Sequence, residues 1–171
     1  MIKRLLPIML AVFLLTGCNS VEVADRVFVK AIFADISGEN FLVSILYTTP
    51  EGEEEIFSSK GDSFENALVY AEKTLGRNVF TGHCRTIFIG KGIENPVEDI
   101  KYVAESGKFS HKTIICRCDG KKVLTAENID FLSDMIKDER GKDFGTLFSV
   151  FSGDRTGLPI VTIRNGFIGL L

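Results

Sequence analysis

Apolar and polar residues along this chain fall into short blocks that predict one sheet and several helices. Val, Ile and Phe are concentrated in 25–36 and 41–47, on either side of Ser-Gly-Glu-Asn, which predicts a β-hairpin with a four-residue loop. Apolar side chains occupy both faces of both strands, as is typical of central strands covered on both sides. A short edge strand is expected at 55–59.

Helical periodicity follows. The stretch 64–75 has apolar residues every three or four positions, with Asp62 as its expected N-cap and Gly76 as its stop. Pro96 begins a second predicted helix that runs to about 106. A third helix is predicted over 126–137, where the same spacing recurs.

The remaining apolar blocks predict further strands and one more short helix. The helix is expected within 143–151, and the strands are 84–89, 112–118, 160–164 and 167–171, the last two joined by Asn165-Gly166. Strands and helices therefore alternate without an internal repeat. This order predicts an α+β (mixed α/β) fold, with one mixed central sheet flanked by three to four helices. A length of 171 residues suits one domain, expected over 25–171.

The N-terminal segment has the features of a secretory signal peptide. Two basic residues, Lys3 and Arg4, precede 11 apolar residues, a run too short to span a membrane. Leu15-Thr16-Gly17-Cys18 resembles the bacterial lipobox, in which the cysteine becomes the lipidated N-terminus. The interpretation is a signal peptide over 1–17 and a lipid-bearing linker over 18–24. The alternative is a secreted protein with an incidental cysteine.

Composition narrows the function classes. Apolar residues make up 45% and charged residues 25%, as in ordinary globular proteins. The net charge is −3, and removing Lys3 and Arg4 with the signal peptide leaves 18 basic and 23 acidic residues, or −5. An acidic domain is repelled by polyphosphates, which argues against nucleic-acid binding.

The three remaining cysteines are the main candidates for chemistry. Cys116 and Cys118 lie two apart on a predicted strand and so point to the same face. They fit three interpretations: buried core thiols, a disulfide from Cys84 to one of them, or a metal site completed by Cys84 and His83. The spacing matches zinc sites poorly, and core thiols are favoured. No metal, cofactor or catalytic motif is expected, and the chain is predicted not to be an enzyme.

One segment carries a family resemblance. Gly76-Arg77-Asn78-Val79-Phe80-Thr81-Gly82-His83, between a helix and a strand ending at Gly90, resembles a hallmark of the Ger(x)C family. Cys18 matches that family's lipidated cysteine, and Asp25-Arg26 and the final hairpin are also similar. The matched residues Gly76, Arg77, Phe80, Gly82 and His83 are expected to be structural. Gly76 ends a helix, Gly82 permits a close approach to the strand, and Arg77 can donate to helix-end carbonyls.

The resemblance implies the N-terminal domain of a lipoprotein C subunit of a spore germinant receptor. It implies a non-enzymatic accessory subunit on the spore inner membrane, with A- and B-type integral-membrane subunits as partners. Members are usually longer and carry a Trp, whereas this chain has none. Two alternatives are a free-standing lipoprotein module that binds a small solute or wall component, and a thiol oxidoreductase using Cys116 and Cys118.

Overall fold

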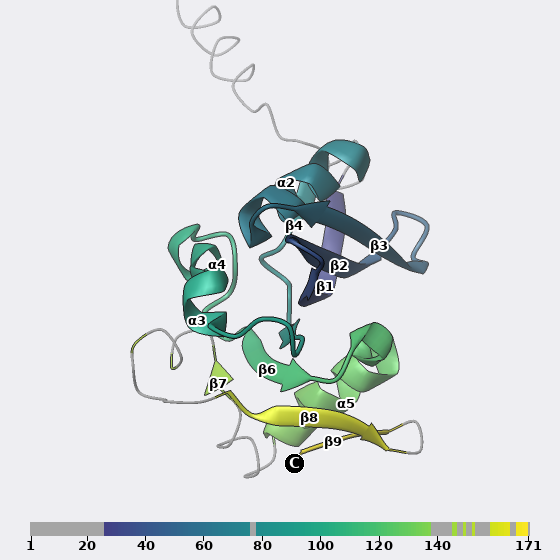
Figure 1. Cartoon of the computed structure of the whole chain (residues 1–171). Coiled ribbons are helices and arrows are strands. Elements are labelled where there is room, and N and C mark those ends of the chain that lie inside the picture. Colours follow the sequence, from purple (N-terminus) through teal and green to yellow (C-terminus); the bar gives the residue numbers. More distant parts are fainter. Residues whose placement is uncertain are drawn as a thin grey trace, which may run out of the picture.

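A computed structural model describes residues 26–75, 78–137, 145–146, 149, 152, 158–164 and 167–170. The signal peptide, Cys18 and the linker lie outside these residues, as do Gly76, Arg77, the Asn165-Gly166 turn and Leu171. The described part forms a nine-stranded mixed sheet with helices on both faces (Figure 1). The predicted single α+β domain is therefore confirmed.

Three antiparallel strands form one half of the sheet. They are β1 (Arg26–Ser37), β2 (Asn40–Thr48) and β3 (Glu54–Gly61), with β3 at the edge as predicted. Ser37 pairs with Asn40, so the loop has two residues rather than the predicted four. Gly38 has φ 67°, which favours glycine and suits a tight hairpin turn. Lys30 forms a bulge in β1, where the register with β2 shifts.

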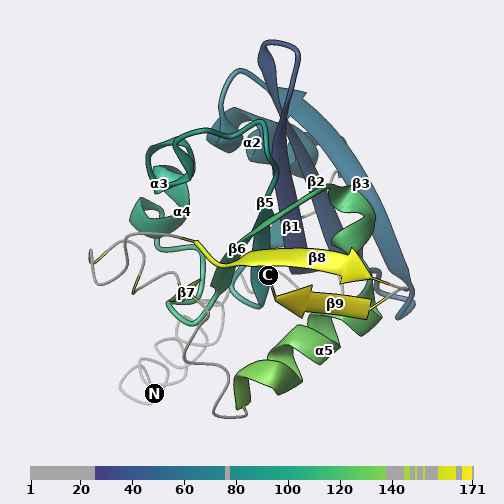
Figure 2. The ribbon, with the colours of Figure 1, turned by 60° about the horizontal axis from the view of Figure 1, so that its bottom comes forward.

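The other half of the sheet is mainly parallel. Its strands are β4 (Asn78–Phe80), β5 (Thr86–Ile89), β6 (Ile114–Cys118), β7 (Gly145–Thr146), β8 (Ile160–Arg164) and β9 (Phe167–Leu170). The sheet order is β3-β2-β1-β5-β6-β8-β9, with β4 paired to the start of β1 and β7 paired to β6. Strands β4, β5, β6 and β8 run parallel to β1, whereas β7 and β9 are antiparallel to their neighbours. Figure 2 shows β8 and β9 side by side.

Four α-helices and one 3₁₀ turn lie in the described part. They are α2 (Phe64–Leu75), α3 (Pro96–Asp99), α4 (Lys101–Glu105), η2 (Lys121–Val123) and α5 (Ala126–Lys137). The predicted bounds of α2 and α5 are confirmed, but Ser63 rather than Asp62 caps α2, because the Ser63 hydroxyl accepts from the Asn66 N–H at 3.1 Å. The single helix predicted over 96–106 is two short helices. Ile100, with φ −109° and ψ 16°, leaves the helical conformation between them.

Two apolar cores lie on opposite faces of the sheet. One is covered by α2 and α4 and includes Phe64, Leu68, Ile100 and Val103. The other is covered by α5 and includes Ile129 and Leu132. Neighbouring positions of β1 and β5 enter opposite cores, so both strands are covered on both sides. The central position predicted for the first strand is therefore confirmed.

Two short strands differ from the sequence predictions. β4 was not predicted, because three residues are too few for a periodic pattern. Gly145 and Thr146, placed in a predicted helix over 143–151, form β7 and pair with β6 instead. Ser149 of that stretch is helical, as predicted, and its other residues lie outside the described ones. The predicted hairpin of β8 and β9 is confirmed by its register, in which Arg164 pairs with Phe167.

The buried centre of β5 should be far less tolerant of truncation than the distal sheet. Ile87 is fully buried, whereas Ile160 on β8 is 43% exposed. Ile87→Ala should lower the free energy of unfolding by about 2–5 kcal/mol. The matched variant Ile160→Ala should lower it by less than about 1 kcal/mol. Urea denaturation measures both, and equal losses would contradict the assignment of the core.

Candidate functional site

The family-like segment forms a corner where the chain passes from α2 to β5. β4 pairs in parallel with the first residues of β1, so that Arg26 lies beside Asn78 and Phe28 beside Phe80. After β4 the chain turns, and the Cys84 N–H donates to the Thr81 carbonyl at 2.9 Å. The Arg85 N–H then donates to the Lys30 carbonyl at 2.8 Å, and β5 begins alongside β1. The corner therefore fixes where β5 enters the sheet.

Three rings pack together in this corner. Phe80 meets Phe28 and His83 edge to face, with ring centroids 5.9 and 5.1 Å apart. Phe28 and His83 stack at 5.7 Å. The Arg26 guanidinium lies 5.7 Å from the Phe80 ring centroid, in cation–π geometry. Phe80 and His83 of the motif are thus joined to the start of β1, and we call these three rings the aromatic corner.

Gly82 leaves space for the Phe80 ring. A Cβ atom at Gly82 would lie 2.7 Å from the tip of that ring, closer than real side chains approach. Its backbone has no left-handed φ, so the constraint is close packing. The sequence pattern predicted that Gly82 permits a close approach of the backbone to the following strand. In the structure the close contact of Gly82 is with the Phe80 ring.

Gly90, the last residue of the family-like strand, also marks a close contact. A Cβ there would collide with the carboxylate of Asp35 on β1. That carboxylate accepts from the backbone N–H groups of Ile36 at 2.8 Å and Gly92 at 2.9 Å. Asp35 therefore fixes the turn that leaves β5, while the aromatic corner fixes the entry.

Two clefts adjoin the aromatic corner and share Gly82 and Ser110. The larger has a volume of about 550 Å³ and lies between Glu72 of α2, 79–82 and 107–110. The other, of about 410 Å³, is lined by 82–85, 112–114 and Ser133 of α5, among others. Both volumes lie in the range of small-ligand sites.

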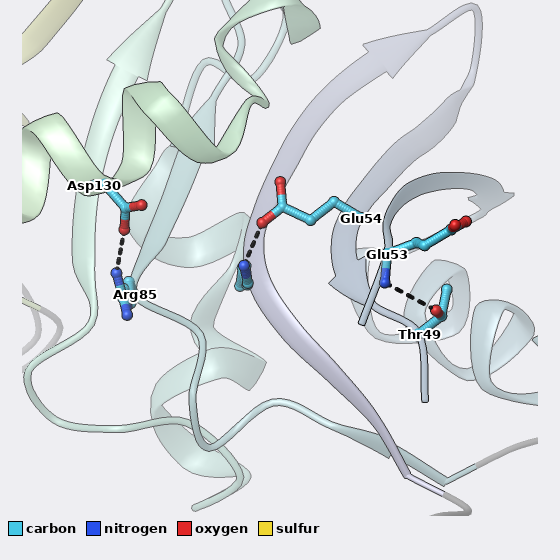
Figure 3. A network of polar contacts seen from close by, with 6 residues as sticks. Thr49, Glu53, Glu54, Arg85 and Asp130 are labelled. Atoms are coloured by element: carbon cyan, nitrogen blue, oxygen red, sulfur yellow. Dashed lines mark hydrogen bonds and ion pairs between the residues drawn. The ribbon is translucent and has the colours of Figure 1, made fainter. Parts of the chain in front are cut away.

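Charged side chains border both clefts. In the larger cleft, Lys108 lies 3.7 Å from Glu72. The hydrogen bond of Lys108 to the Tyr102 side chain, assisted by Glu72, raises the pKa of its ammonium group. At the second cleft, Arg85 pairs with Asp130 of α5 at 2.6 Å (Figure 3). Both pairs are largely solvent-exposed, so they orient side chains more than they stabilise the fold.

The candidate cysteines are free thiols, buried in the two cores. Cys84 lies at the aromatic corner, and Cys116 and Cys118 lie in the core under α5. Burial raises the pKa of Cys84 from 9.0 to about 12 and that of Cys118 to about 11. Burial also raises the pKa of Cys116 well above 9.0. A thiol with a raised pKa is a poor nucleophile and metal ligand at neutral pH.

The structure brings together only part of the predicted set. Phe80, Gly82, His83 and Cys84 share the corner, whereas Cys116 and Cys118 lie elsewhere on the sheet. Sequence reasoning missed Phe28 and Lys108, and no local pattern marks either residue. In the described ranges, no group of three or more His, Cys, Asp or Glu residues is placed to hold a metal ion. No helix in this same part is long and apolar enough to cross a membrane.

The domain has an α+β fold, and its chain reaches β5 through the aromatic corner, where Gly82 packs against Phe80. Residues 19–148 match the family model described as the spore germination protein N-terminal domain. The chain belongs to this family, the N-terminal domain of the Ger(x)C proteins, which confirms the resemblance drawn from 76–83. Neither curated proteins nor solved structures give a significant match.

The contact of Gly82 with Phe80 can be tested by adding one methyl group. Gly82→Ala should displace the Phe80 ring and lower the free energy of unfolding by about 1–3 kcal/mol. Gly169→Ala is the matched control, because a Cβ at Gly169 meets nothing within 4 Å. The cost of Gly82→Ala should fall when Phe80→Leu is also present, and urea denaturation of the four variants measures this coupling. Strictly additive losses would contradict the contact.

The buried thiols should make folding stability fall at alkaline pH. In the unfolded chain a thiol ionises near pH 9.0, whereas folded Cys84 stays neutral until about pH 12. Its contribution is thus fully present below pH 9 and is lost as the pH rises towards 12, by up to about 1.4 kcal/mol per pH unit. Cys84→Ala should reduce this slope, as measured by urea denaturation at pH 8 and pH 10. Iodoacetamide labelling of Cys84 in the folded chain at pH 8 would contradict the assignment.

Proposed function

We propose that this protein is a membrane-anchored, non-enzymatic accessory subunit of a spore germinant receptor. The observation that carries the proposal is the family match over 19–148, which begins directly after Cys18. The lipobox-like segment supports cleavage before Cys18 and its lipidation. The proposed domains are a signal peptide over 1–17, a lipidated linker over 18–24 and a germination domain over 25–171.

The position of the aromatic corner supports a role beside the membrane. Phe28 and Phe80 lie at the end of β1 where the described chain begins. Seven residues separate Cys18 from Arg26, and a fully extended chain of this length spans only about 25 Å. A lipid on Cys18 would hold this end of the sheet near the headgroups. We therefore assign the aromatic corner and its two clefts to the surface that meets the integral-membrane subunits.

The proposed contribution is positional. A lipid anchor confines the domain to two dimensions and raises its effective concentration near membrane partners. The motif residues that the structure describes are engaged in packing, and the buried thiols have raised pKa values. These features support an adaptor more than a catalyst. The A- and B-type receptor subunits are the proposed partners, on the outer face of the spore inner membrane.

Loss of the anchor should abolish the function while leaving the fold intact. In spores lacking all other C-type subunits, Cys18→Ala should reduce nutrient-triggered rehydration to the level of the gene deletion. The lipid is then absent, and the protein should leave the membrane fraction. Ser20→Ala, which leaves Cys18 in place, is the control and should germinate normally. Normal germination by the deletion strain would overturn the proposal.

A second candidate function is a free-standing module that captures a small solute. The cleft of about 550 Å³, with Lys108 and Glu72 at its border, is the observation that favours it. Calorimetric titration of the full chain with nutrient mixtures distinguishes the two. Tight binding that Lys108→Met abolishes would support the module, whereas an adaptor should release no heat.

A further inference from the structure

The outer edge of β3 is open. β3 pairs with β2 on one side, and within the described ranges no strand pairs with its other side. Such an edge presents unpaired N–H and C=O groups that can extend the sheet into another chain. Ile56, in the middle of this strand, is 51% exposed. The order of side chains along this edge decides which partner strand it fits.

One face of β3 has a self-complementary order of side chains. Ser59 donates to the Ala67 carbonyl of α2 at 2.7 Å, so odd-numbered positions face α2. Even-numbered positions face the opposite side, where Ser58 meets Ser44 at 2.7 Å. Along that side the order is Glu54, Ile56, Ser58 and Lys60. An acid begins the row and a base ends it, so the same row reversed places opposite charges together.

We propose that β3 pairs antiparallel, edge to edge, with β3 of a second copy of this chain. The twofold axis passes through Phe57, which places Glu54 opposite the partner's Lys60, and Lys60 opposite the partner's Glu54. Ile56 then lies opposite the partner's Ser58. Opposite charges directly across an antiparallel pair stabilise it. A slip by two residues removes both charge pairs, so the charges select this register.

In the single copy both charged side chains lean inward over β2, where they contact residues of β1. One oxygen of Glu54 pairs with Lys30, and the other is turned away from that contact (Figure 3). A carboxylate accepts from two cations at once. Lys60 donates one hydrogen bond, of 3.1 Å, to the Ser37 hydroxyl, and an ammonium group carries two further N–H donors. Both contacts are solvent-exposed and therefore weak, so dimerisation exchanges them for ion pairs to the partner when the two side chains turn towards the outer edge.

The symmetry suits a protein held at a surface. The twofold axis is perpendicular to the sheet, so α2 lies on the same side in both copies. If that axis lies along the membrane normal, both copies meet the bilayer with the same face. An edge of eight residues buries less than the roughly 1,200 Å² of a standard interface, so pairing in solution is weak. Confinement to a membrane would strengthen it.

Charge reversal tests the register. Lys60→Glu replaces two attractive contacts with two repulsive ones and should weaken dimerisation of the full chain in mild detergent by about tenfold or more. The exchange Glu54→Lys with Lys60→Glu restores opposite charges and should recover affinity to within about threefold. Lys73→Glu on α2, with the same change in charge, should have no effect. Sedimentation equilibrium measures all four proteins.

Two outcomes of that measurement overturn the proposal. One is a wild-type chain that stays monomeric at all concentrations, and the other is Lys60→Glu dimerising as tightly as wild type. Neither depends on spore germination, so this proposal and the proposed function fail separately.

Engineered cysteines give an independent test of the same register. In directly opposed antiparallel positions the Cα atoms lie about 4.5–5.5 Å apart, within the range of a disulfide. Ile56→Cys with Ser58→Cys should therefore cross-link two copies under mild oxidation on phospholipid vesicles. Ser58→Cys alone should not, because its counterpart lies on the diagonal. No cross-linking by the double variant, or equal cross-linking by Ser58→Cys alone, would overturn the register.

Discussion

The two hydrogen-bond ladders of β1 hold the halves of this domain together. On one side β1 pairs antiparallel with β2, and on the other it pairs in parallel with β4 and then β5. Without this strand the β2–β3 half and the β5–β6 half share no ladder. Both faces of β1 are covered by apolar cores, so its backbone groups are satisfied only by its neighbours. Every other element is placed relative to β1.

The aromatic corner and Asp35 define where β5 lies beside β1. At the entry, the packing of Phe80 and His83 on Phe28 brings β4 and the turn to the first residues of β1. At the exit, Asp35 holds the turn after Gly90. Two residues of the family motif, Phe80 and His83, thus lie where β4 and β5 align with β1. Side-chain contacts at this point are important because parallel strands are joined by long connections, which do not fix the register of the pair by themselves.

Most of the fold could be predicted from the sequence, because its main elements carry strong local signals. The bounds of α2 and α5 follow from helical periodicity, and the double-sided apolar pattern of β1 predicts a central strand. Elements with weak local signals were missed. β4 has three residues, β7 has two, and Ile100 interrupts a helix whose periodicity continues through it. These features depend on contacts with distant segments, which a local pattern does not record.

The candidate site was predictable in its residues but not in its contacts. The motif contains Phe80 and His83, yet the ring that both of them contact, Phe28, lies more than fifty positions earlier. The three cysteines that were candidate metal ligands lie on opposite faces of the sheet, two in one core and one in the other. Side-chain type identifies candidates for chemistry, whereas the long-range pairing of strands decides which of them meet.

The central place of β1 has a mechanical consequence. The described chain enters the sheet at an interior strand, so tension transmitted through the N-terminal segment acts along β1 before any other element. To slide out, β1 must shear the ladder with β2 and the ladder with β4 and β5 together, whereas an edge strand such as β3 could be peeled from a single neighbour. A domain tethered through this end is therefore attached at a strand whose removal breaks two ladders rather than one.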